Sequence, residues 1–205
     1  KITVWGRKSS VNVQSVLWCL EELDLAYRRI NAGFAYGVVG TPAFLEMNPN
    51  GKVPTVIDGD FVMWESNSVI RYLARKHKSA LYPSEFEVRN MVERWMDWEL
   101  SVVAPHQGTV LVGLVRTKPE DRDNAKIKTA GTAWARGMTI LDEQLAKTGH
   151  VAGDDFTLAD IPLGPIAHRF FSLDIERPDL PNLRRWYETL SGRPAFDKWC
   201  VIEMA

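Results

Sequence analysis

The chain has 205 residues, which is enough for one domain or two small ones around a buried core. Its 25 basic and 26 acidic residues give a formal net charge of -1, so composition supplies no electrostatic attraction toward nucleic acid or an anionic membrane. The partner is therefore expected to be a small molecule. No apolar run approaches the roughly 18 to 20 residues of a membrane span, and the start lacks a signal-peptide pattern, so a soluble, cytoplasmic protein is expected.

The first 78 residues predict a strand, a helix, a second strand, a hairpin and a helix. "KITVW" alternates apolar side chains as a strand does, and "VNVQSVLWCLEEL" places them at helical spacing. A strand at "YRRI" completes a βαβ unit with parallel strands. "VPTVID" and "FVMW" flank the turn signal "DGD" and predict a hairpin, and "SNSVIRYLARK" predicts the helix after it. We therefore predict an α/β domain over residues 1–78.

From residue 79 onward the composition changes, and no convincing strand follows. "SALYPSE", residues 79–85, is typical of a linker. A long helix is then predicted to continue to about Arg116, with kinks at Pro105 and Gly108. Further helices are predicted at roughly 121–147 and after Pro181. The sequence therefore predicts an all-α domain over residues 86–205.

One helix start has a recognisable capping pattern. In "GDDFTLADI", Thr157 is followed three residues later by Asp160, which is a capping box with Asp in place of the usual Glu. We assign this pattern to folding and not to substrate binding.

The two cysteines indicate a reducing compartment. Cys19 and Cys200 are far apart in the sequence and fit neither a zinc motif nor a disulfide framework. We therefore expect a cytoplasmic protein without a metal ion.

Three stretches, taken together, resemble the cytosolic glutathione S-transferase family, in particular its bacterial theta-like members. They are "NPNGKVPTVIDGDFVMWESNSVIRYL", "WGRKSSVNVQSVLWCLEELDLAY" and "FTLADI", and the likeness covers nearly the whole chain. The resemblance implies a thioredoxin-like N-terminal domain with a four-stranded mixed sheet that binds glutathione as co-substrate. It also implies an all-α helical-bundle C-terminal domain that carries the electrophile pocket, and a homodimer.

The resemblance assigns the first of these stretches to glutathione. Val53-Pro54 lies where the family has a cis proline, and the backbone of Val53 would pair with the extended tripeptide. Lys52 is expected to meet the glycyl carboxylate as a point charge. Glu65 and Ser66 complement the ammonium and α-carboxylate of the γ-glutamyl end. The alternatives are an ordinary trans proline, a solvated lysine and a serine that only caps the following helix.

The loop "GRKSSVN" lies where the family carries its catalytic Ser, Tyr or Cys. A free thiol with a pKa near about 8.5 is mostly protonated at pH 7, so the reaction needs a group that stabilises the thiolate. We favour Ser10, assisted by the positive end of the following helix, with Asn12 as the principal rival or an auxiliary donor and Ser9 third. Ser10 or Asn12 as a plain helix cap is the alternative. No cysteine lies in this loop, which disfavours disulfide-exchange chemistry.

The electrophile pocket is expected along "VAPHQGTVLVGLVR". The candidates are His106, Val110, Leu114 and Arg116, although each is also compatible with the core or with a helix end. The predicted function is conjugation of glutathione to a small, hydrophobic electrophile, as in detoxification. The alternatives are a glutathione-dependent dehalogenase, isomerase or peroxidase on the same scaffold, or a non-catalytic interaction protein of the same fold.

Overall fold

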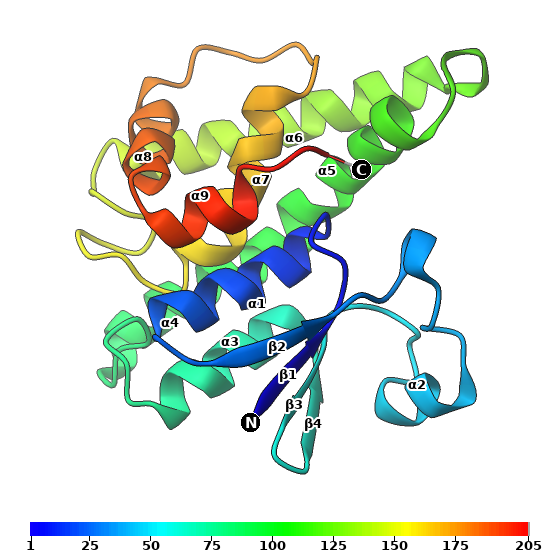
Figure 1. The fold of residues 1–205 in the computed structure, drawn as a ribbon. Coiled ribbons are helices and arrows are strands. Elements are labelled where there is room, and N and C mark those ends of the chain that lie inside the picture. Colours follow the sequence, from blue (N-terminus) through cyan, green and yellow to red (C-terminus); the bar gives the residue numbers. More distant parts are fainter. Residues whose placement is uncertain (205) are drawn as a thin grey trace.

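The computed structural model describes residues 1–204, and within that range four strands form one sheet (Figure 1). They are β1 (Ile2–Trp5), β2 (Tyr27–Ile30), β3 (Thr55–Asp58) and β4 (Phe61–Trp64), in the order β2-β1-β3-β4. β1 and β2 are parallel, whereas β3 is antiparallel to both of its neighbours. The predicted βαβ unit, the hairpin and the mixed four-stranded sheet are confirmed.

Helices α1 (Val11–Glu22) and α3 (Ser66–Lys76) pack against one face of this sheet, as their periodicity predicts. Two further elements were not predicted, namely α2 (Pro42–Met47) and a 3-10 turn (Phe34–Tyr36). The side chain of Thr41 caps α2, and the next residue is a proline in the first helical turn. This Thr-Pro pair was the available signal for a helix start.

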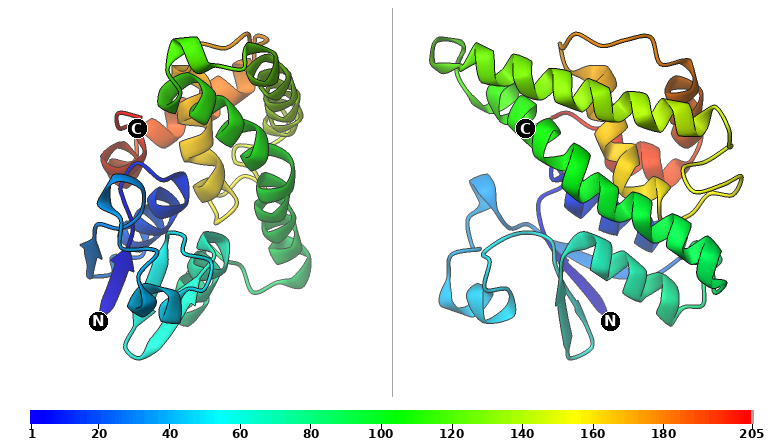
Figure 2. Two further views of the ribbon diagram at one scale, coloured as in Figure 1. Left: turned by 90° about the vertical axis from the view of Figure 1, so that its right-hand side faces the viewer. Right: turned by 180° about the vertical axis from the view of Figure 1, so that it is seen from behind.

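The predicted long helix is present as a continuous helical segment that ends at Arg116 (Figure 2). It consists of α4 (Phe86–Trp98), a π-helical turn (Glu99–Val103), α5 (Ala104–Leu111) and a second π-helical turn (Val112–Arg116). The first π turn ends just before Pro105, so the irregularity lies next to one of the two predicted kink positions. The predicted linker 79–85 lies between α3 and α4, and the domain division itself stays a prediction.

The other helices of the described chain follow a short 3-10 turn (Pro119–Asp121). They are α6 (Asn124–Leu145), α7 (Asp160–Ser172), α8 (Pro181–Ser191) and α9 (Pro194–Cys200). The helices predicted at 121–147 and after Pro181 are therefore confirmed as α6 and α8. Among residues 1–204, no helix combines the length and the hydropathy needed to cross a membrane.

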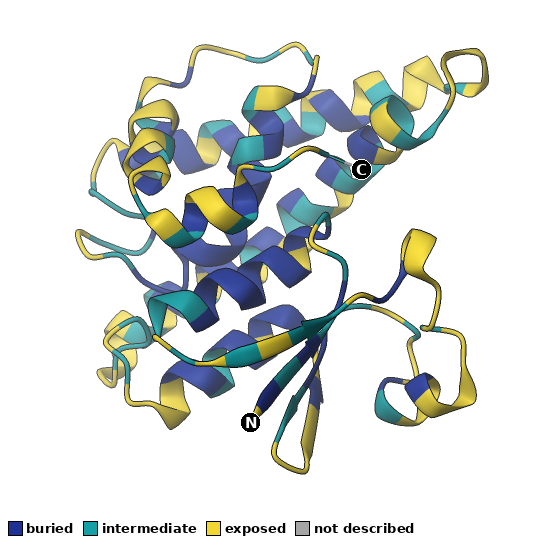
Figure 3. Cartoon of the chain, viewed as in Figure 1, coloured by how far each residue is buried: buried dark blue, intermediate teal, exposed yellow. Residues whose placement is uncertain are grey.

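Helix α1 packs against both halves of the chain and is buried along most of its length (Figure 3). It contacts α3 on one side and α7 and α9 on the other. Trp18 is fully buried, and its ring centre lies 4.8 Å from that of Phe196 on α9. Its indole N–H donates to Glu22 at 2.8 Å, and Arg193 binds the same carboxylate with two N–H groups.

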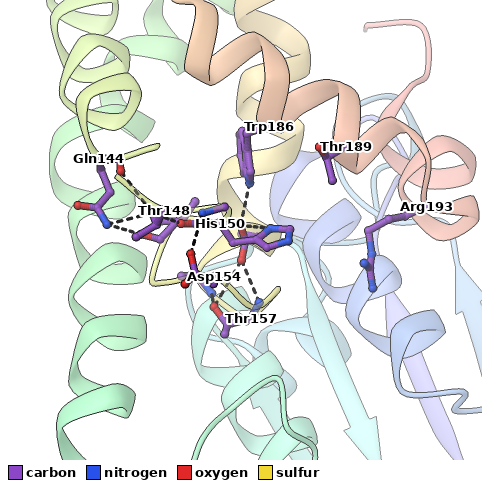
Figure 4. A network of polar contacts seen from close by, with 12 residues as sticks. Gln144, Thr148, His150, Asp154, Thr157, Trp186, Thr189 and Arg193 are labelled. Carbon is purple, nitrogen blue, oxygen red and sulfur yellow. Dashed lines mark hydrogen bonds and ion pairs between the residues drawn. The ribbon is translucent and has the colours of Figure 1, made fainter. Parts of the chain in front are cut away.

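The capping pattern at Thr157 has the folding role that the sequence predicts. The fully buried Asp160 carboxylate accepts the backbone N–H of Thr157 at 2.9 Å and that of Val151 at 3.1 Å. It also accepts the indole N–H of Trp186 at 2.8 Å, so α8 is bonded to the start of α7 (Figure 4). A buried carboxylate with this many partners stabilises the helical half, because its hydrogen-bonding capacity is used.

A methyl group at Gly164 should destabilise the contact between the two halves. A Cβ at this position of α7 would lie 2.6 Å from Cζ3 of Trp18 and 2.9 Å from Cε2 of Phe196. We expect Gly164→Ala to lower the free energy of unfolding by about 1 to 3 kcal/mol, as overpacking does in cores. Urea denaturation measures this change.

Gly108→Ala is the matched control, because Gly108 is also helical and a Cβ added there meets no described atom within 4 Å apart from its chain neighbours and the backbone of its own helix. It should be neutral or stabilising by up to about 1 kcal/mol, because alanine favours the helix. Equal stability of Gly164→Ala and the wild type would contradict the close contact.

Candidate functional site

The sheet register brings three loops to one edge. Trp5 at the end of β1 pairs with Thr55 at the start of β3, and Thr55 pairs with Trp64 at the end of β4. Neighbouring strands lie about 4.8 Å apart, so this row places three chain segments side by side. They are the loop after Trp5, the Val53-Pro54 step before Thr55, and the Glu65-Ser66 pair after Trp64. The segments that carry the predicted glutathione and thiolate residues thus lie along one edge of the sheet.

Ser10 occupies the position just before the first turn of α1 and is buried. Its hydroxyl makes no capping hydrogen bond and has no partner among residues 1–204. Ser10 thus holds the N-cap position of α1, as the alternative has it, but without the side-chain hydrogen bond that a cap usually makes, and Asn12 is not the cap. Asn12 lies inside the first turn and is exposed, and Ser9 is half-buried. The arrangement leaves the Ser10 hydroxyl at the positive end of a helix, where it can donate to an anion.

The Val53-Pro54 peptide bond is cis, as the resemblance implies. The turn before it is held by Asn48, whose side-chain amide donates to the carbonyl of Lys52 at 2.9 Å and to Thr55 Oγ1 at 3.1 Å. Within the described chain, the backbone N–H and C=O of Val53 make no hydrogen bond. An extended peptide can therefore pair with Val53. This role of Asn48 was not predicted. The one sequence pattern that could have indicated it is the turn composition of "NPNG".

Glu65 takes the cap position of α3 with a φ of 69°, and Ser66 is the first helical residue. The alternative that Ser66 is the cap is therefore wrong. A positive φ at a residue other than glycine costs roughly 1 kcal/mol or more, and such strain clusters at functional sites. Glu65 is exposed, whereas Ser66 is buried with no hydrogen-bond partner for its hydroxyl in the described chain. The start of α3 thus carries the Glu65 carboxylate, the Ser66 hydroxyl and the free N–H groups of the first helical turn.

A buried carboxyl group lies behind this helix start and was not anticipated. The side-chain amide of Asn67 donates to the carbonyl of Met96 at 3.0 Å and contacts Glu99 Oε2 at 3.5 Å. Burial raises the pKa of Glu99 to about 8, and the hydrogen bond from Asn67 opposes this rise. The pair connects the first turn of α3 to the π turn in the helical half. Sequence patterns give no signal for a contact between residues this far apart.

The four candidates of the electrophile pocket lie in different environments. Val110 is completely buried and belongs to the core, so it cannot line an open pocket. His106 and Leu114 are half-buried. Arg116 contacts the N-terminal half, because its guanidinium carbon lies 4.9 Å from the ring centre of Phe34. An open hollow of about 420 Å³ lies instead between α5 and α6, and none of the four residues lines it.

No group of three or more His, Cys, Asp or Glu side chains within residues 1–204 is arranged to hold a metal ion. Cys19 and Cys200 are both buried and unpaired. Burial raises the pKa of both thiols, so neither is a reactive thiolate.

Comparisons with known proteins agree on one family. Residues 1–75 match the model of the glutathione S-transferase N-terminal domain, and residues 103–194 match that of the C-terminal domain. The chain is 40% identical to the glutathione S-transferase GstB of Escherichia coli (strain K12), and the alignment of 207 residues covers 100% of both proteins. The chain is also similar to the theta class glutathione S-transferase of Xanthomonas axonopodis pv. citri solved with glutathione bound. The TM-score is 0.97 at 42% identity, over 100% of this chain and 99% of that one.

The substitution Glu99→Gln should flatten the pH dependence of stability. The pKa of Glu99 is about 8 in the folded chain, above its ordinary value of 4.5. Between these values the folded chain keeps a proton that the unfolded chain has released. The contribution of Glu99 to the free energy of unfolding is therefore greatest below its unfolded pKa. It falls as the pH rises toward the folded pKa, with a slope of up to about 1.4 kcal/mol per pH unit.

Urea denaturation between pH 5 and 9 measures this slope. The wild type should lose more stability than Glu99→Gln as the pH rises, and Glu188→Gln, at an exposed position on α8, should behave like the wild type. A Glu99→Gln variant as steep as the wild type would contradict the burial of a proton at this site.

Proposed function

The chain belongs to the glutathione S-transferase family, and we propose that it binds glutathione along the edge formed by Val53, Glu65 and Ser66 and activates the thiol with Ser10. Membership makes it a transferase that uses glutathione as co-substrate. The observation that carries the proposal is the row Trp5, Thr55 and Trp64, because it places the three loops next to one another.

The proposed pose follows from the charges of the tripeptide. The γ-glutamyl ammonium binds the Glu65 carboxylate, and the α-carboxylate binds the Ser66 hydroxyl and the free N–H groups at the start of α3. The backbone of the cysteinyl residue pairs with the N–H and C=O of Val53, as in strand addition. The exposed ammonium of Lys52 meets the glycyl carboxylate. This pose directs the cysteine side chain toward the loop after β1.

Ser10 then donates its hydroxyl proton in a hydrogen bond to the thiolate sulfur. The proposal is supported by the absence of any other partner for this hydroxyl in the described chain and by its place at the start of α1. The helix dipole adds a positive field in the same direction. Asn12 is the less favoured donor, because it is exposed and lies within the first turn.

The thiolate is transferred to an electrophile held between this loop and the segment from His106 to Arg116. The same site with a different pocket would serve a dehalogenase, an isomerase or a peroxidase, and no specific contact favours those reactions over conjugation. A non-catalytic interaction protein is also disfavoured, because the backbone strain at Glu65 and the unused hydroxyl of Ser10 have no structural purpose.

We also infer a homodimer in a reducing, cytoplasmic compartment. Exposed aromatic and apolar side chains on β4 and at the start of α4 support the dimer, namely Phe61, Trp64, Phe86 and Val88. The two unpaired, buried cysteines support the compartment. Sedimentation equilibrium is the measurement that checks the dimer, and a monomer at micromolar concentration would contradict it.

The substitution Ser10→Ala should raise the thiol pKa of bound glutathione by about 1 to 2 units, because a hydrogen bond to an anion contributes roughly 1.5 to 3 kcal/mol. Ultraviolet difference absorbance of the thiolate, followed against pH, measures this pKa. If Asn12→Ala raises the pKa and Ser10→Ala does not, Asn12 and not Ser10 stabilises the thiolate.

The substitution Glu65→Gln should weaken glutathione binding about 10- to 100-fold, because it removes a charged acceptor from the ammonium. Isothermal titration calorimetry measures the affinity, and Glu188→Gln is the matched control at an exposed position in the helical half. If wild-type protein binds no glutathione at millimolar concentration, the proposed site is refuted. Unchanged affinity in Glu65→Gln would refute the γ-glutamyl pose alone.

A further inference from the structure

Three carbonyl groups in the loop between β1 and α1 accept hydrogen bonds from side chains outside the loop. The donors are Arg29 for Gly6 at 2.8 Å, Gln14 for Lys8 at 2.9 Å and Arg169 for Ser9 at 2.8 Å. Arg29 and Gln14 belong to the N-terminal half, whereas Arg169 lies on α7 in the helical half. The helical half therefore contributes directly to the conformation of this loop.

Both peptide groups that flank the Cα of Ser10 are held by hydrogen bonds. In the peptide before it, the Ser9 carbonyl accepts from Arg169, and the Ser10 N–H donates to the carbonyl of Arg7 at 3.3 Å. In the peptide after it, the Ser10 carbonyl accepts the backbone N–H of Gln14 at 2.8 Å. A residue has only two soft backbone dihedrals, so fixing both flanking peptides fixes the direction of its Cα–Cβ bond. Arg169 therefore helps to set the direction of the Ser10 side chain.

Arg169 lies in the interior of the molecule and is only 4% exposed. A second N–H group of its guanidinium donates to the side-chain oxygen of Gln107 on α5 at 3.0 Å. Burial, followed by the charges of Arg116 and Arg7, lowers the pKa of Arg169 to about 9, so the side chain is still a cation at neutral pH. Its guanidinium is therefore charged but not exposed to a substrate.

Arg177 provides a comparison, because it also donates to backbone carbonyls. Its acceptors lie at the C-terminal end of α7, where they are the carbonyls of Phe170, Phe171 and Leu173. Such bonds stabilise a helix end. Arg169 instead reaches a carbonyl 160 positions earlier in the sequence, directly before Ser10. Burying a cation against neutral acceptors is costly, and the loop that Arg169 holds gives a reason for its position.

We propose that Arg169 is a positioning residue for activation of the thiol, because it holds the Ser9 carbonyl and thereby keeps the Ser10 hydroxyl directed at the sulfur. This role rests on the proposed function, in which Ser10 donates to the thiolate. A donor that is already oriented stabilises a developing charge without reorganisation, so loss of its support weakens the hydrogen bond. Since Gln107 lies on α5 beside His106, the same arginine also connects the loop to the segment expected to hold the electrophile.

The substitution Arg169→Met removes the donors and keeps a long, unbranched side chain. The thiol pKa of bound glutathione should rise by about 0.5 to 1 unit, a loss of about three- to tenfold in the ionisation constant. Ultraviolet difference absorbance of the thiolate, followed against pH, measures this shift. At a pH below this pKa the bound thiol is neutral, so the Kd for glutathione from calorimetry should stay within about twofold of the wild type. An unchanged thiol pKa would overturn the proposal.

The double variant Ser10→Ala/Arg169→Met separates an action through Ser10 from a direct effect of the arginine's charge on the sulfur. It should have the same thiol pKa as Ser10→Ala alone, because the hydroxyl that Arg169 orients is then absent. If the two shifts add, Arg169 acts on the thiolate independently of Ser10, and the positioning role is refuted.

Arg177→Met is the matched control, because it removes an arginine that also donates to carbonyls of the helical half. It should lower the free energy of unfolding and leave the thiol pKa unchanged; an equal rise in the thiol pKa would show a general effect of destabilisation and overturn the proposal. Gln107→Leu is a milder second variant for the case in which circular dichroism shows Arg169→Met to be unfolded. It removes the anchor of Arg169 on α5 and should raise the thiol pKa by a smaller amount, and no rise would refute the role. Failure of the wild type to bind glutathione would instead refute the proposed function.

Discussion

The register of the four-stranded sheet is the constraint on which the site depends. Val4, Val56 and Met63 form one cross-strand row and are buried in the core with residues of α1 and α3. A slip of one residue would turn these side chains to the other face of the sheet, so their burial fixes the pairing. The next row, which ends β1 and β4 and begins β3, is fixed with it. Three loops of the site start from that row, and their spacing follows from hydrophobic burial in the sheet.

Helix α1 connects the loop of Ser10 to the helical half of the chain. Its first turn follows Ser10, and its middle is held by Trp18 against α7 and α9. Arg169 on α7 also bonds the carbonyl of Ser9, so the loop is anchored from the helical side as well as from the sheet. Contacts from both halves therefore hold the segment that carries the Ser10 hydroxyl.

Some buried polar groups of the described chain are fully hydrogen-bonded, whereas others have no partner. Asp160 accepts hydrogen bonds from two backbone N–H groups and an indole, and this network stabilises the fold. Along the site edge, the Ser10 and Ser66 hydroxyls and the Val53 backbone have no partner in the described chain. Groups left in this state can bind a ligand with little competition from the protein itself, and this difference from Asp160 supports the glutathione site proposed along this edge.

The sequence by itself determined the order of the four strands, most of the helices and the family of the chain. Apolar residues alternate in β1 and recur at helical spacing in α1 and α3, because each element buries one face. These patterns can therefore be recognised from the sequence alone. Glu65, Ser66 and Val53-Pro54 were found because they lie in one short motif. Helical spacing could not separate Val110 in the core from Arg116 beside Phe34, because both lie on the same helical segment.

Only the tertiary structure decided the contacts between distant segments. It showed that the Ser10 hydroxyl does not cap α1, that Asn48 holds the turn before Val53, and that Asn67 meets the buried Glu99. It also brought Arg169 to the loop of Ser9, across 160 positions of sequence. No local pattern encodes such contacts, because they depend on how separate helices and strands are placed by the burial of their apolar faces.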